Sequence, residues 1–308
     1  MTDTDTQVQG TFTDKVTDRI LRGLIGGILR IPYHRRVPMM GWIVRRIIGP
    51  LAGYKKRAIE SLTLIYDDKS SAEISQIADQ VLDNVGRTLI ENYSSADFAK
   101  QIEQATVQGD GLAALERAAA DGTPVIFVTG HFGNHEASRQ WLNAQGYRIG
   151  GLYRPMKNPY FNDHYARTMT EMSGPVFAQG RRGTAGFARH LKEGGLGTLL
   201  FDVHVHGAEP ISFMGKPAFT ATSAAEIALK FGAVMIPYFA RRQANGLDFD
   251  IYIENPIQPS DPVTMMTEAT QRLERHVRAA PEQWFWVHRR WKLHLIQDDA
   301  TIAPGPAS

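Results

Sequence analysis

A strand, a turn and a helix start follow one another in the segment Pro124-Val-Ile-Phe-Val-Thr-Gly-His-Phe-Gly-Asn-His-Glu136, which makes it the strongest indication of the fold. Val125 to Val128 is a β-branched and aromatic run with the length of a buried strand. Gly130 and Gly133 allow the chain to turn sharply. Asn134 has the side chain of an N-cap for a helix over 134–145. A strand that passes directly into a helix is typical of α/β folds.

The same alternation continues on both sides of this segment. Helical periodicity is expected over 71–93, 111–120, 159–172, 184–192, 222–230 and 262–279, and strands over 147–153, 176–177, 197–201, 234–241 and 249–253. Such alternation predicts an α/β fold with a mixed central sheet and helices on both faces. We expect this domain to occupy residues 66–300, between a disordered N-terminus (1–13) and a flexible tail (301–308).

His131 lies directly after the first strand, and Glu136 lies in the first turn of the following helix. Residues five apart on one helix do not face each other, so we expect Glu136 to fold back onto a histidine that sits in the loop. A carboxylate bonded to one imidazole nitrogen leaves the other free as a general base. The pair therefore predicts proton abstraction from a hydroxyl. The alternative is a polar loop with an ordinary capping carboxylate.

Further polar groups follow other strand ends, where ligands of open α/β sheets bind. Arg154 precedes a proline that restricts its backbone, and a guanidinium suits bidentate phosphate recognition. We expect Arg154, Arg167 or Lys157 to meet a phosphate. Backbone N–H groups around Gly133 and Asn134, or Arg154, are expected to stabilise an oxyanion.

Asp202-Val-His-Val-His206 allows two interpretations. Its alternation would place three possible ligands on one face of a strand, which is a metal-binding pattern. Alternatively, Asp202 is a structural carboxylate in a polar turn. No metal or cofactor is needed for the chemistry that the rest of the chain indicates.

The segment from Arg19 to Arg57 is strongly basic and contains no acidic residue. Its apolar stretches are shorter than the roughly 18–20 residues of a spanning helix. We therefore expect residues 14–65 to form two or three basic amphipathic helices that lie on an anionic membrane surface. A solvated basic face and a nucleic-acid patch are the alternatives, but no nucleic-acid-binding motif is present. The chain has no cysteine, which excludes disulfides and thiolate chemistry.

Several blocks resemble, in order, those of the late acyltransferases of bacterial lipid A synthesis, within the lysophospholipid acyltransferase superfamily. They are Gly130-His-Phe-Gly-Asn-His-Glu136, Tyr153-Arg-Pro-Met-Lys-Asn-Pro159, Asp202-Val-His-Val-His-Gly207, Phe213-Met-Gly-Lys-Pro-Ala-Phe-Thr220 and Pro281-Glu-Gln-Trp-Phe-Trp-Val-His-Arg-Arg-Trp-Lys292. The chain departs from that pattern at His135, where tryptophan is usual, and at Val203.

The resemblance implies a glycerol-3-phosphate acyltransferase-like fold at the cytoplasmic face of the bacterial inner membrane. It implies transfer of an acyl chain from acyl carrier protein to a hydroxyl of a lipid A precursor, with His131 as base and Glu136 as its partner. Asp202 then orients substrate or supports an arginine. A lysophospholipid or glycolipid acceptor, and a non-catalytic lipid-binding protein, remain as alternatives. The aromatic and basic residues at 284–292 are expected to be partly buried near the cleft.

Overall fold

The computed structural model describes residues 10–292. Seven strands form the central sheet in the order β1-β9-β8-β2-β5-β3-β4. They are β1 (Thr106–Gln108), β2 (Val125–Thr129), β3 (Ile149–Tyr153), β4 (Val176–Ala178), β5 (Leu196–Leu200), β8 (Val234–Arg242) and β9 (Phe249–Ile253). Only β8 and β9 pair antiparallel, and the other neighbours are parallel. The mixed central sheet expected from the sequence is confirmed.

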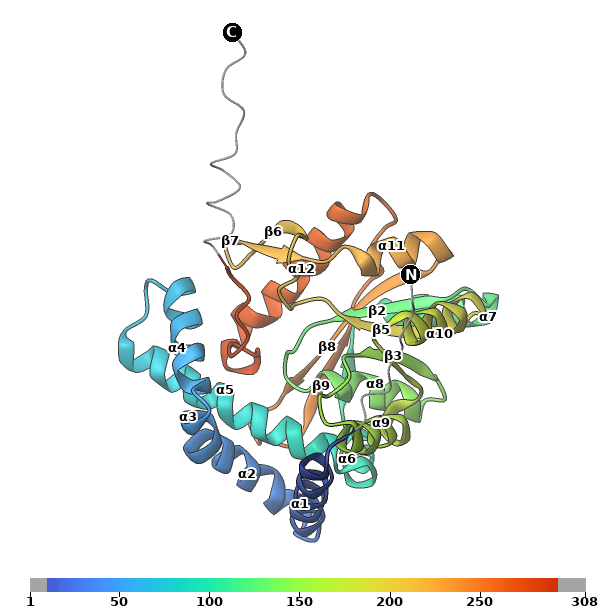
Figure 1. Ribbon diagram of the computed structural model, residues 1–308. Coiled ribbons are helices and arrows are strands. Elements are labelled where there is room, and N and C mark those ends of the chain that lie inside the picture. The colour runs from blue at the N-terminus through green and yellow to red at the C-terminus, as the bar shows by residue number, and fades with distance from the viewer. Residues whose placement is uncertain (1–9, 293–308) are drawn as a thin grey trace.

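Helices cover both faces of this sheet (Figure 1). They are α5 (Ser71–Asn92), α6 (Ser95–Ile102), α7 (Gly111–Asp121), α8 (His135–Ala144), α9 (Pro159–Ser173), α10 (Arg181–Lys192), α11 (Ser223–Phe231) and α12 (Pro262–Ala279). Strand β2 shows why both faces are covered. Ile126 and Val128 enter the core beneath α5, α11 and α12, whereas Val125 and Phe127 enter the core beneath α7, α8 and α9. Alternate side chains of a fully buried strand need apolar partners on both sides.

The basic N-terminal region forms three helical stretches. They are α1 (Phe12–Leu29), then α2 (Tyr33–Ile43) running through the π-helix Val44–Ile48 into α3 (Gly49–Leu51), and then α4 (Tyr54–Ile65). Helix α1 therefore begins inside the segment 1–13 that was expected to be disordered, because Thr11 and Asp14 form a capping box. The rest of that expectation, and the tail at 301–308, lie outside the described residues.

These N-terminal helices pack against the α/β body. Val44, Ala58 and Leu62 belong to the same apolar core as the buried face of α5. Within residues 10–292, no helix is long and apolar enough to cross a membrane.

Two elements were not anticipated from the sequence. Strands β6 (Glu209–Phe213) and β7 (Lys216–Thr220) form an antiparallel hairpin that packs on α12. Its two-residue turn places Met214 at φ 54° and Gly215 at φ 76°, the left-handed region that tight hairpins require. The chain ends its described part with a 3-10 turn (Pro281–Gln283) beside α5, followed by an irregular segment to Lys292.

Candidate active site

The register of two parallel strands brings His131 and Asp202 together. Strands β2 and β5 are neighbours, and Thr129 lies opposite Leu200 at their carboxyl ends. The pairing extends one residue further, since the Phe201 N–H donates to the Thr129 carbonyl at 3.1 Å. His131 and Asp202 each lie two residues beyond these paired strand ends. The sheet therefore delivers an imidazole and a carboxylate to the same crevice.

Asp202 is buried and accepts three hydrogen bonds. Its Oδ1 lies 2.8 Å from Nδ1 of His131, while its Oδ2 accepts the His131 backbone N–H at 2.7 Å. The indole Nε1 of Trp284 donates to the same Oδ2 at 2.8 Å. Burial alone would raise the pKa of Asp202, but His131 and these donors hold that pKa well below its usual range. Asp202 is therefore an anion at neutral pH.

This contact fixes the state of His131. With Nδ1–H donating to Asp202, the neutral ring carries its lone pair on Nε2. The side chain is 34% exposed, so the ring is open to solvent on one side. Partial burial lowers the pKa of His131, but the charge and hydrogen bond of Asp202 outweigh it and the net pKa is raised. A raised pKa makes Nε2 a stronger base.

The expected pairing of His131 with Glu136 is wrong, because the structure gives Asp202 that position. The Glu136 carboxylate instead accepts from Arg139 Nη1 at 3.3 Å and from the Ser173 hydroxyl at 2.9 Å. It also lies 3.8 Å from Nε2 of His135. Burial would raise the pKa of Glu136, and the Arg139 charge, helped by these other contacts, makes the net shift downward. The Glu136 carboxylate therefore faces Arg139 on its own helix and Ser173 at the end of α9, and not His131.

Gly133 and Asn134, which are expected to contact substrate, both shape the loop. The Gly133 N–H donates to the Gln283 carbonyl at 2.8 Å, so it is not free for an oxyanion. Asn134 is fully buried: its oxygen caps α8 at the Glu136 N–H, and its amide donates to Glu91 at 2.9 Å. The prediction that Asn134 is an N-cap is confirmed. Asn134 has no exposed atom that could contact substrate in this structure.

A buried polar network holds this loop from below. Glu91 receives two hydrogen bonds from Arg242, one of them at 2.7 Å, and also binds Asn134. Asn84 donates to the Gly133 carbonyl at 3.0 Å and accepts from Arg242 at 2.9 Å. Every member is satisfied by another, and such a network rigidifies the turn that presents His131.

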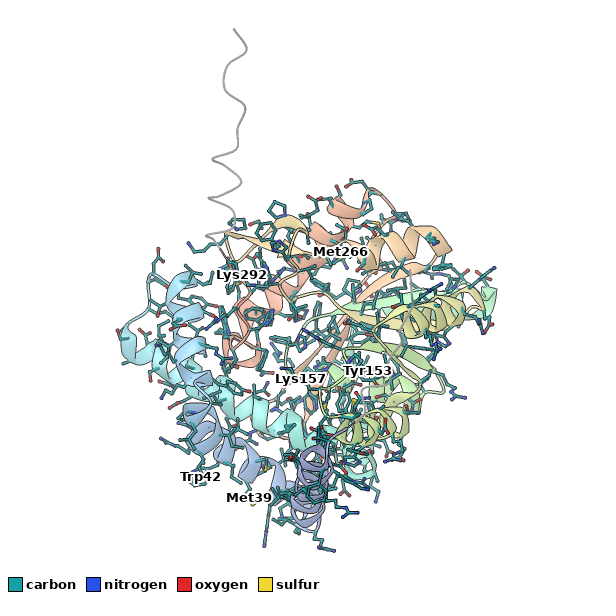
Figure 2. All side chains as sticks on the ribbon, viewed as in Figure 1. Met39, Trp42, Tyr153, Lys157, Met266 and Lys292 are labelled. Carbon is teal, nitrogen blue, oxygen red and sulfur yellow. The ribbon has the colours of Figure 1, made fainter. Side chains whose placement is uncertain are left out.

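Of the expected phosphate ligands, Arg154 alone lines the cavity at His131. It is exposed, as are Lys157 and Arg167. Figure 2 shows Lys157 near Tyr153, at the end of β3 and before α9. Arg167 lies on α9, outside the cavity lining.

The metal-binding interpretation required Asp202, His204 and His206 to alternate along a strand, but β5 ends at Leu200. The segment that follows is an irregular loop. The described residues contain no group of three or more His, Cys, Asp or Glu side chains with a metal-binding arrangement. The Asp202 carboxylate accepts hydrogen bonds from His131 and Trp284.

The cavity beside this dyad has a volume of about 530 Å³. His131, His135, Glu136 and Arg139 line it from α8 and its loop, and Arg154, Thr198 and His288 line it from other strand ends and the C-terminal segment. Burial lowers the pKa of His135 to about 4, so this ring is neutral at physiological pH. A second, more apolar cavity of about 250 Å³ also reaches His131, between α5 and Phe285. His131 thus lies where two cavities meet.

Several site residues have no individual signal in the sequence. Trp284 and His288 belong to the aromatic and basic C-terminal block, whose residues were expected to be partly buried. Trp284, Trp286 and Trp291 are instead buried in one packed cluster with Phe213. Arg139 is also buried, and it ties α8 to the Ile149 and Pro175 carbonyls. Helical periodicity does not distinguish such an arginine from a solvated one.

Comparison with known proteins shows the family of this chain. Residues 19–293 match the family described as bacterial lipid A biosynthesis acyltransferase. The chain is 25% identical over 261 residues to a lipid A biosynthesis acyltransferase of Haemophilus influenzae, covering 83% of this chain and 81% of that protein. It is 23% identical over 283 residues to the lipid A biosynthesis lauroyltransferase of Escherichia coli K12, covering 88% and 89% of the two chains. It is 24% identical over 289 residues to the palmitoleoyltransferase of the same organism, covering 88% and 90%. The family match spans most of the chain and includes every block that carries the site, so this protein belongs to the bacterial lipid A biosynthesis acyltransferases.

Proposed function

We propose that this acyltransferase moves a fatty acyl chain from the thioester of acyl carrier protein to a hydroxyl of a lipid A precursor. Membership of the family supports acyl transfer in lipid A biosynthesis. The two cavities that meet at His131 support a reaction between two substrates. The relatives include both a lauroyl and a palmitoleoyl transferase, so the acyl chain length is left open.

The observation that carries the mechanism is the 2.8 Å contact between His131 Nδ1 and Asp202. Nε2 of His131 removes the proton from the acceptor hydroxyl, and Asp202 stabilises the imidazolium that forms. The alkoxide oxygen bonds to the thioester carbonyl carbon, and the carbon–sulfur bond then breaks. The imidazolium returns its proton to the leaving thiolate. General base catalysis of this kind contributes on the order of 10²- to 10⁴-fold in rate.

Glu136 has a different place in this proposal. Its carboxylate lines the same cavity and is neutralised by Arg139, to which it is bonded in a buried pair. We infer that Glu136 and Arg139 hold the wall of the cavity against which substrate is positioned. Arg154, at the rim, is the proposed oxyanion donor, and Lys157 and Arg167 are exposed candidates for a phosphate of the carrier-protein arm.

The N-terminal helices support a location at the cytoplasmic face of the inner membrane. Large apolar side chains are exposed on them, namely Phe12, Ile20, Leu24, Trp42, Ile47, Ile48 and Leu51. Trp42 is seen at the outer side of α2 in Figure 2. Exposed arginines such as Arg35 and Arg46 stand among them. Apolar and basic side chains on one surface are typical of proteins that lie on anionic lipid.

A reconstituted reaction tests the proposal. Purified protein is incubated with acyl carrier protein that bears labelled acyl chains, and with a lipid A precursor, a lysophospholipid or a glycolipid as acceptor. We expect the ester to form on the lipid A precursor and to disappear with His131→Ala. Faster transfer to the lysophospholipid or the glycolipid would assign that acceptor instead, and full activity of His131→Ala would exclude the proposed base.

A further inference from the structure

A third cavity, of about 600 Å³, lies next to the active site between α4 and the C-terminal segment. Arg57 and Tyr54 line it from α4, and Phe285, Arg289 and Lys292 line it from the C-terminal segment. Figure 1 shows this segment, in red, beside α4 and α5, and Figure 2 shows Lys292 on the same side of the molecule. Two parts of the chain far apart in sequence therefore build one basic hollow.

The three cations of this cavity are not neutralised within the described part of the chain. No carboxylate lines the cavity, and none forms an ion pair with Arg57, Arg289 or Lys292 among residues 10–292. Arg57 stacks over the Tyr54 ring at 5.3 Å instead. By contrast Lys55, two positions earlier, pairs with Asp79 at 2.7 Å. Like charges held together without a counter-ion favour an anionic ligand.

The local field is visible in a neighbouring histidine. Burial first, and then the charges of Lys292 and Arg290, lower the pKa of His204 to about 4. His204 thus stays neutral at physiological pH, and the positive charge of the cavity comes from the arginines and the lysine. Two guanidinium groups match the oxygens of a phosphate in fork geometry.

This cavity adjoins the catalytic one. His204 and His288 line both of them. The His204 N–H donates to Nε2 of His288 at 2.9 Å, so these two residues form a fixed wall between the cavities. Phe285, which lies 6.0 Å from His131 between ring centres, lines the basic cavity and the apolar cavity. A headgroup held at Arg57 and Arg289 is thereby adjacent to the base.

The position of α4 indicates which substrate brings the anion. The preceding residues Ile47, Ile48 and Leu51 are exposed, with Leu51 at 84%. In the proposed membrane association these side chains enter the lipid phase. The basic cavity, which begins at Tyr54 three residues after Leu51, then lies at the depth of the lipid headgroups. A phosphate attached to a membrane-held acceptor reaches this depth.

We propose that Arg57, Arg289 and Lys292 form a binding site for a phosphate group on the sugar headgroup of the lipid acceptor. The inference rests on the proposed acyl transfer for its choice of acceptor. The phosphate of the acceptor then binds in this cavity. Arg154, at the rim of the catalytic cavity, remains available for the thioester of the acyl donor.

Two variants and a matched control test the site kinetically. In Arg57→Ala and Arg289→Ala we expect the KM for the phosphorylated lipid A precursor to rise about tenfold or more, because a charge-assisted pair is lost. The kcat and the KM for the acyl donor should stay unchanged. Arg117→Ala removes the same charge from the exposed face of α7, at the opposite side of the molecule in Figure 1, and should leave every constant unchanged.

A binding measurement separates this site from the proposed reaction. His131→Ala protein is mixed with vesicles that contain the lipid A precursor, before or after phosphatase treatment. We expect binding to fall on removal of the phosphates, and that difference to disappear when Arg57→Ala and Arg289→Ala are added to the His131→Ala protein, whether or not any acyl transfer is seen. Three results would overturn the site: equal binding of both lipids, a rise in donor KM instead of acceptor KM, or an equal loss with Arg117→Ala. A donor effect would assign the cavity to the carrier protein.

Discussion

At the scale of single residues, the chemistry depends on which carboxylate serves the base. Asp202 is bonded to His131 and to Trp284, whereas Glu136 is bonded to Arg139 and Ser173. The two carboxylates are both buried and both anionic, but they have different tasks. Asp202 sets the tautomer of His131, and Glu136 neutralises the buried Arg139.

The Glu136–Arg139 pair predicts a stability effect. Glu136→Ala leaves the Arg139 charge in the interior with only backbone carbonyls as partners, which costs roughly 3–5 kcal/mol in the free energy of unfolding. Glu136→Gln keeps a hydrogen-bond acceptor for Arg139 and should cost clearly less. Urea denaturation of both variants measures the difference. Equal stability of Glu136→Ala and the natural protein would contradict the role of the pair.

The raised pKa of His131 predicts a pH profile. The base must be neutral, so kcat/KM should fall as pH falls through a value above the ordinary 6.5 of histidine. In Asp202→Asn the charge that raises this pKa is gone while burial still lowers it, so the acidic limb should move to lower pH. Residual activity of Asp202→Asn measured from pH 5 to 9 checks the direction. A limb that moves to higher pH would be inconsistent with the dyad.

At the scale of elements, the β2–α8 loop is built around one glycine. Gly133 has φ 55°, and a Cβ there would stand 1.8 Å from the Ala240 carbonyl oxygen. We expect Gly133→Ala to displace the loop, to reduce kcat strongly and to lower the melting temperature.

Gly146 provides the matched control for this prediction. It also has a positive φ, of 92°, but a Cβ there meets nothing within 4 Å. Gly146→Ala therefore has only the cost of the left-handed backbone, roughly 1–3 kcal/mol, and should keep its kcat. If both variants behaved alike, the close approach to Ala240 would not be what matters.

Some features of these elements could be predicted from the sequence, and others could not. The strand and helix of residues 124–136 follow from local composition, and the N-cap at Asn134 was found in the same way. The partner of His131 was not found, because it depends on which strands are neighbours. Once β2 and β5 pair with Thr129 opposite Leu200, Asp202 follows as the contact of His131. The short distance in sequence favoured Glu136 instead. The β6–β7 hairpin was not predicted, because Met-Gly is not one of the residue pairs that indicate a tight hairpin turn.

At the scale of the whole molecule, the family, the α/β fold and the three basic N-terminal helical stretches were predictable, because each depends on patterns spread over many residues. The cavities could not be predicted, because each is lined by residues from segments that are far apart in the sequence. Arg290 illustrates this: it pins the C-terminal segment to the Phe219 carbonyl and the Thr220 hydroxyl of the hairpin, a contact that only the tertiary fold creates.

Membrane association is the prediction that belongs to this scale. Trp42→Ser, Ile48→Ser and Leu51→Ser together remove three exposed apolar side chains from the stretch that runs from α2 to α3. Each contributes roughly 1 kcal/mol or more when it enters lipid, so binding to anionic vesicles in a flotation assay should fall at least about tenfold. Leu229→Ser, at an exposed position of α11, is the control and should bind as before.

The most direct test of the account compares Asp202→Asn with Glu136→Gln in the same acyl-transfer assay. Both variants replace a buried carboxylate by its amide without a change in size. We expect Asp202→Asn to lose most of its kcat, because a neutral amide cannot balance the charge of the His131 imidazolium, while Glu136→Gln keeps a substantial part of its kcat. A larger loss of kcat in Glu136→Gln, with Asp202→Asn close to the natural enzyme, would show that Glu136 and not Asp202 supports His131.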